Sequence, residues 1–172
     1  MPTLRSAVAL GAAITVFLGA AATPRAWGFE AHRLITGHAI ELLPPELKPF
    51  FQRHRAMVVE HAIDPDLWRN AGWLEEPPRH FLDIDAFGPP PFDALPRDYD
   101  QAVTKFGKEM VQKNGQLPWR LAEMYDKLVT AFRDHARGRP FALENVKFFT
   151  AVLSHYMSDA HVPFHAVINY DG

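Results

Sequence analysis

The stretch from Leu153 to His165 places three histidines and an aspartate within eleven residues. On an α-helix, residues four positions apart lie on one face about a turn apart, so His155 and Asp159 can point to a common centre. Two ligands of one metal ion need this arrangement. His165 follows Pro163, where the helix is expected to end or kink, so it can approach from another direction. The stretch therefore predicts a metal centre at the end of a helix.

The helical positions of this pair sharpen the prediction. With about 100° per residue, His155 and Asp159 fall at the edge of the face that is expected to be buried. An ionised carboxylate there is costly unless a cation compensates its charge, and a metal ion would do so. The simpler alternative is an aspartate that accepts a hydrogen bond from a histidine one turn away. Because the chain has no cysteine, a transition metal would need nitrogen and oxygen ligands.

The rest of the pattern predicts one compact, all-α domain. The chain has 172 residues, of which 48% are hydrophobic, enough for one sizeable core. Apolar residues recur at helical spacing between prolines and glycines, and no segment alternates convincingly as a strand. A formal net charge of -2 argues against a polybasic nucleic-acid scaffold. Helices are expected around residues 31–42, 47–59, 103–110, 121–132 and 147–161, with an extended proline-rich loop over 77–96.

Residues 1–26 are predicted to be a secretory signal peptide. Arg5 gives a positive start, residues 7–22 form an apolar run, and residues 23–26 break it. The run is short for a membrane-spanning helix, so export is favoured over a membrane anchor. The expected product is a secreted or periplasmic protein, residues 27–172, with no transmembrane anchor after signal removal.

Several further motifs precede the histidine-rich stretch. In chain order they are Trp27 followed by His32, Asp66 within Asp-Pro-Asp-Leu-Trp-Arg (with Asp64 as the alternative), His80-Phe81-Leu82-Asp83, and finally the His-x-x-x-Asp-x-x-x-Pro-x-His pattern that starts at His155. With these motifs in this order, the chain resembles the zinc-dependent family that unites fungal single-strand-specific nucleases with bacterial phospholipases C. The resemblance covers residues 27–172.

The resemblance implies a cluster of three zinc ions. The implied ligands of the first ion are Asp66, His80, His155 and Asp159. Asp159 would bridge to a second ion, which His32 and Trp27 would also bind. The α-amino nitrogen and the carbonyl oxygen of Trp27 can chelate one metal in a five-membered ring once the signal peptide is removed.

His165 matches a ligand of the third zinc ion in the family. That ion also needs a downstream histidine followed four residues later by a carboxylate, and the sequence stops at Gly172 first. Either the sequence is a fragment of a longer protein or it lacks one complete metal site. The abrupt ending favours a fragment.

The activity that the resemblance implies is phosphodiester hydrolysis by water activated on zinc. Asp66 would orient the water, Phe81 would stack on a nucleobase, and Asp83 would accept a hydrogen bond from its edge. The short interval between Trp27 and His32 favours a nuclease acting on single-stranded DNA or RNA over a phospholipase C acting on phospholipid. No obligate protein partner is expected. Two alternatives remain: a zinc-binding protein without catalysis, and a helical domain whose histidines are all structural.

The proposed role of Trp27 generates a prediction about processing. A precursor that retains residues before Trp27 has an amide in place of the free α-amine, so we expect it to lack the ion shared by Trp27 and His32. Native mass spectrometry of the processed and unprocessed proteins measures their zinc content. An unprocessed protein that carries the full zinc complement would contradict this role.

Overall fold

The computed structural model describes residues 28–170. The signal-peptide prediction for residues 1–26 and the proposed ligand Trp27 lie outside this range. The predicted all-α fold is confirmed, because helices dominate the described chain. Between residues 28 and 170 the β pairing is limited to one isolated bridge, which joins Leu82 to Gly115.

The described chain contains eight α-helices and four 3-10 helices. The α-helices are α2 (Phe29–Glu41), α3 (Lys48–Arg53), α4 (Arg55–Glu60), α5 (Asp64–Asn70), α6 (Tyr99–Phe106), α7 (Lys108–Lys113), α8 (Leu117–Ala136) and α9 (Ala142–Asp159). The 3-10 helices are η1 (His61–Ile63), η2 (Pro77–Arg79), η3 (Ile84–Phe87) and η4 (Pro163–His165).

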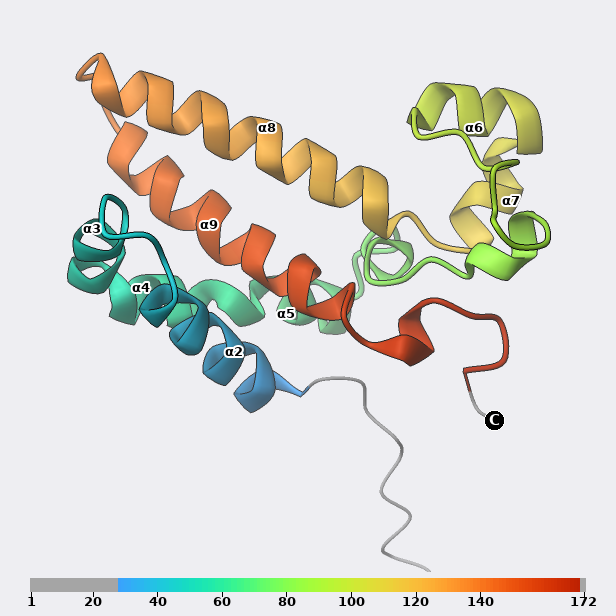
Figure 1. Ribbon diagram of the computed structural model, residues 1–172, viewed down its shortest axis with the longest axis horizontal. Coiled ribbons are helices and arrows are strands. Elements are labelled where there is room, and N and C mark those ends of the chain that lie inside the picture. Colours follow the sequence, from blue (N-terminus) through green and yellow to red (C-terminus); the bar gives the residue numbers. More distant parts are fainter. Residues whose placement is uncertain (1–27, 171–172) are drawn as a thin grey trace, which may run out of the picture.

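Helix α9 is the central element of the fold. It runs antiparallel to α8 along one side, while α2, α4 and α5 lie along its other side (Figure 1). Ala151 contributes to the core shared with Ile40 and Val58, whereas Val152 and Tyr156 contribute to the core shared with α8. These α9 side chains are fully buried, because helices cover opposite faces of α9.

A third core lies at one end of the molecule, where α6 and α7 meet the proline-rich loop (Figure 1). Leu82 and Phe87 from the loop pack there with Ala102 and Val111 from the two helices. The expectation that residues 77–96 have little regular structure holds, apart from the short 3-10 helices η2 and η3.

Two of the expected helices are interrupted. The segment 47–59 is divided at His54 into α3 and α4, and the segment 103–110 is divided at Gly107 into α6 and α7. Gly107 has a φ of +85°, which a residue without a Cβ adopts easily and which ends the helical hydrogen-bond pattern. The hydrophobic spacing continues across this glycine, so periodicity alone could not locate the break.

Within residues 28–170, no helix combines the length and the apolar composition needed to cross a membrane.

Backbone hydrogen bonds attach the segment around Leu82 to two distant parts of the chain. The Leu82 amide donates to the His165 carbonyl at 2.8 Å, and the Asp83 amide donates to the Asn114 carbonyl at 2.8 Å. The Phe81 carbonyl accepts from the amide of Leu117 at 3.1 Å, where α8 begins. Residues 80–84 are therefore held between the start of α8 and the segment that follows α9.

Gly115 allows this close approach and yields a prediction. Its φ is +95°, and a Cβ there would overlap the carbonyl group of Phe81. We expect Gly115→Ala to lower the free energy of unfolding by more than about 2 kcal/mol, through backbone strain and the clash together. Thermal and denaturant unfolding measure this loss.

Gly138→Ala is the matched control. Gly138 also has a positive φ, +67°, but a Cβ there meets nothing within 4 Å. Gly138→Ala should therefore lower the free energy of unfolding only through backbone strain, by about 1 kcal/mol. Equal losses in the two variants would contradict the proposed contact.

Candidate metal centre

His155 and Asp159 lie at the C-terminal end of α9 and are deeply buried. Their exposed fractions are 0% and 2%. The sequence predicted that they lie at the edge of the buried face. This prediction is wrong, because both side chains are almost completely enclosed. An edge position assumes a helix covered from one side, whereas α2 and α5 cover the face of α9 that α8 leaves open.

Three more of the predicted ligands meet this pair. His32 comes from the first turn of α2, Asp66 from the first turn of α5, and His80 directly follows η2. All five side chains are buried. Donor atoms within 4.8 Å of one another form two groups, His32 with His155 and Asp159, and Asp66 with His80 and His155. These buried groups could hold a metal ion.

The carboxylate of Asp159 lies among three imidazole rings. Its Oδ1 is 3.5 Å from Nε2 of His32, while its Oδ2 is 2.9 Å from Nδ1 of His80 and 3.2 Å from Nε2 of His155. Burial alone would raise the pKa of Asp159, but the contacts from His155 and His80 outweigh it and hold the pKa well below its usual range. Asp159 is thus an ionised carboxylate whose two oxygens face different histidines.

The proton of His155 can be assigned from its neighbour. Nδ1 of His155 lies 2.8 Å from the carbonyl oxygen of Ala62. A carbonyl can only accept, so Nδ1 carries the hydrogen and donates. In the neutral ring, Nε2 of His155 would present its lone pair toward Asp159, 3.2 Å away, as a metal ligand must.

The same reasoning applies to His32. Its Nδ1 is 2.7 Å from the hydroxyl of Ser158, and that hydroxyl donates its single proton to the His155 carbonyl at 2.7 Å. Ser158 consequently accepts from His32, and Nε2 of His32 presents its lone pair to Asp159. Burial, assisted by the neighbouring His155, lowers the pKa of His32 to about 4, so the ring is neutral at pH 7.

These assignments test whether the residues fit a metal ion. His32 and His155 stack at 3.9 Å between ring centroids, and Nε2 of each ring faces the carboxylate of Asp159. Lone pairs facing a carboxylate repel unless a cation lies between them. Buried imidazole nitrogens and carboxylate oxygens are the ligands that divalent transition metals take in proteins. The site fits such a cation.

Asp66, rather than the alternative Asp64, belongs to the cluster. Asp66 is 4% exposed, and its Oδ2 lies 3.9 Å from Nε2 of His32. Its Oδ1 forms an ion pair with Nη2 of Arg69 at 2.7 Å, which orients the carboxylate. Asp64 instead contacts Nδ1 of His61 at 2.8 Å.

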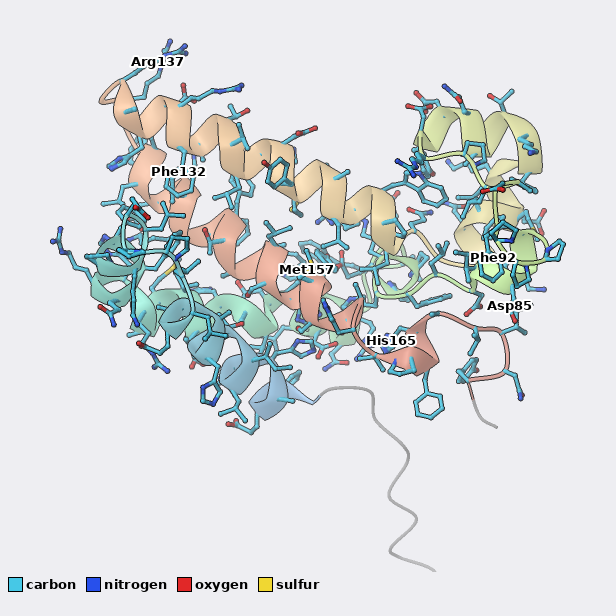
Figure 2. The ribbon with its side chains drawn as sticks, viewed as in Figure 1. Asp85, Phe92, Phe132, Arg137, Met157 and His165 are labelled. Atoms are coloured by element: carbon cyan, nitrogen blue, oxygen red, sulfur yellow. The ribbon has the colours of Figure 1, made fainter. Side chains whose placement is uncertain are left out.

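The remaining predicted residues lie beside the cluster. His165 sits on η4, beyond the end of α9 (Figure 2). It is half-buried, and its Nδ1 donates to the His80 carbonyl at 3.1 Å. Considering only the residues that the structure describes, His165 belongs to neither group of donor atoms. Phe81 and Asp83 are half-buried in the adjoining segment, and burial together with Asp85 raises the pKa of Asp83.

Sequence reasoning missed two buried polar residues around the site, Ser158 and Glu76. Helical spacing puts Ser158 on the polar face of the helix with His161, yet Ser158 is 4% exposed whereas His161 is exposed. Glu76 is fully buried and contacts Tyr156, whose own burial agrees with its place on the apolar face of the helix. Helical spacing gives no signal for the burial of Ser158 and Glu76, because it depends on which segments cover α9.

Comparison with known proteins adds no further constraint: no family model, curated protein or solved structure matches the chain.

The neutral state of His32 predicts how stability depends on pH in the metal-free protein. In the unfolded chain this histidine takes up a proton near pH 6.5, but in the fold only near pH 4. Between these values the unfolded state binds more protons, so stability falls as the pH falls. Replacing His32 with Gln should reduce the loss in unfolding free energy between pH 7 and pH 5 by on the order of 1 to 2 kcal/mol.

Chemical denaturation at the two pH values checks this expectation. His161→Gln, an exposed change beyond the end of α9, is the control and should leave the pH dependence as it is. A His32→Gln variant with the wild-type pH dependence would show that His32 titrates normally in the fold.

Proposed function

We propose that the protein is a zinc-dependent hydrolase of phosphoric esters, exported from the cell and acting as a nuclease on single-stranded nucleic acid. The observation that carries the proposal is the buried convergence of His32 and His155 on Asp159, with Nε2 of each ring facing the carboxylate. The five clustered residues also match, one by one, positions of the family that the sequence resembles.

Zinc is favoured by the chemistry of the ligands. The cluster combines three imidazoles with two carboxylates and contains no thiolate, since the chain has no cysteine. Mixed histidine and aspartate sites suit zinc, whereas calcium and magnesium prefer oxygen ligands alone. The resemblance extends this proposal to as many as three ions, two of which would use the five clustered side chains and Trp27.

Bound zinc would supply a water of lowered pKa and positive charge that stabilises the phosphate as its bond to oxygen breaks. The residues of this chain would bind and orient. Asp159 would be a ligand together with the histidines that its oxygens face, Oδ1 toward His32 and Oδ2 toward His80 and His155. Asp66, oriented by Arg69, would accept a hydrogen bond from the attacking water and direct it toward phosphorus. No side chain is needed as a nucleophile.

Phe81 and Asp83 are the proposed substrate-binding residues. Both are half-buried, so each keeps part of its surface for a ligand. Stacking of a base on an exposed aromatic ring contributes about 1 to 3 kcal/mol, and such stacking selects unpaired bases. Asp83 would accept a hydrogen bond from the edge of the stacked base. The short interval between Trp27 and His32 is what favours a nuclease over a phospholipase C, which would bind a lipid head group.

A zinc-binding protein without hydrolytic activity is the second candidate. The position of His165 favours it, because this residue lies outside both groups of donor atoms in the described part of the chain. Two zinc ions could then be bound while the third site of the family is incomplete.

The proposal predicts chelator-sensitive cleavage of single-stranded DNA. The purified chain should cut a single-stranded oligonucleotide, lose activity in a chelator, and regain it with zinc. His155→Ala should reduce the rate at least about 100-fold, since it removes a proposed ligand of the ion rather than a supporting residue. His161→Ala, which alters an exposed histidine close in sequence, is the matched control.

A parallel assay on short-chain phosphatidylcholine decides the substrate class. Cleavage of the lipid without cleavage of DNA would replace the nuclease with a phospholipase C. Zinc binding without hydrolysis of either substrate would support the second candidate. A chain that binds no zinc would exclude the nuclease, the phospholipase C and the non-catalytic zinc-binding protein.

A further inference from the structure

Glu76 is a fully buried carboxylate that belongs to neither group of candidate metal ligands. It directly precedes η2, four residues before His80. A buried carboxylate without compensating contacts would strongly destabilise the fold, so its surroundings show what it does.

Glu76 is held ionised and in place by two donors. The Tyr156 hydroxyl donates to Oε1, and Nη1 of Arg79 donates to Oε2 at 2.9 Å. The guanidinium of Arg120 lies 5.2 Å from the centre of the Tyr156 ring. These two hydrogen bonds favour the charged form of the carboxylate and offset the cost of its burial. A carboxylate is therefore aimed rigidly at one side of His80.

His80 lies between two carboxylates. Its Nδ1 is 2.9 Å from Oδ2 of Asp159, inside the candidate metal centre. Its Nε2 points the other way, 3.6 Å from Oε1 of Glu76, and this buried nitrogen has no hydrogen-bond partner among the residues that the structure describes. A metal that takes the lone pair of Nδ1 leaves the hydrogen on Nε2. Glu76 is the acceptor next to that hydrogen.

We infer that Glu76 is a positioning residue for His80: it accepts the Nε2 hydrogen when Nδ1 binds a metal ion, and so sets the tautomer and the orientation of the ring. This inference rests on zinc binding at the site, as proposed above, and is independent of hydrolysis. The carboxylate also makes the imidazole a stronger ligand, because it stabilises positive charge on the ring. Glu76 thereby extends the metal centre beyond the residues that the sequence motifs identify.

The inference predicts that Glu76→Gln weakens zinc binding. The amide has nearly the same volume as the carboxylate but no charge, so we expect the Kd for zinc to rise about 10-fold to 100-fold. Competition with a chromophoric chelator measures the Kd of the full chain. Thermal unfolding of the metal-free variant measures any separate loss of stability.

Two control variants separate positioning from packing. Glu75→Gln makes the same change on the neighbouring residue, whose side chain is 82% exposed, and should leave the Kd as it is. Tyr156→Phe removes one support of Glu76 but keeps its charge, and should raise the Kd less than Glu76→Gln does. Equal effects of Tyr156→Phe and Glu76→Gln would overturn the inference in favour of a packing role.

A second measurement needs only the wild-type protein. Long-range proton–nitrogen NMR of the zinc-loaded chain should show the hydrogen of His80 on Nε2, in slow exchange with water. The inference fails if His80 of the zinc-loaded protein carries its hydrogen on Nδ1. It also fails if Glu76→Gln binds zinc with the wild-type Kd. If the wild-type chain binds no zinc, the proposed metal site itself is wrong. That outcome can be told apart from a failure of the role inferred for Glu76.

Discussion

The buried negative charge of Asp159 is the constraint on which the rest of the site depends. A carboxylate at 2% exposure is tolerated only if the groups around it supply compensating charge or hydrogen bonds. His32, His80 and His155 surround it, and they come from α2, the segment after η2, and α9. The packing of these elements and the chemistry of the site therefore depend on the same side chain.

Hydrogen bonds outside the cluster decide which nitrogen each imidazole offers. The Ala62 carbonyl holds the hydrogen on Nδ1 of His155, and Ser158 does the same for His32. Glu76 stands in the corresponding position behind His80. Preparing a ligand for a metal ion means placing its hydrogen on the far nitrogen, so these partners are as much part of the proposed zinc centre as the ligands.

The segment that carries Phe81 and Asp83 connects the cluster with the rest of the fold. It is hydrogen-bonded to His165 and Asn114, and Gly115 leaves room for its close approach. In the proposed nuclease, this attachment would keep the substrate-binding side chains at a constant position relative to His80. Rigid support of this kind is what orientation of a phosphate and a water requires.

The sequence alone determined the all-α class and most of the helices, because hydrophobic spacing reports directly on a helix that packs by one face. It also pointed to the five clustered residues, since His155 and Asp159 share a helical face and the other three were proposed from a resemblance in motif order. It could not locate the break at Gly107, because the apolar spacing continues through it. Only the tertiary structure decided the depth of Asp159, the burial of Ser158 and the position of Glu76 behind His80. These features arise where α2, α5 and the loop before His80 close over α9, and contacts between segments so distant in the chain leave no local pattern to read.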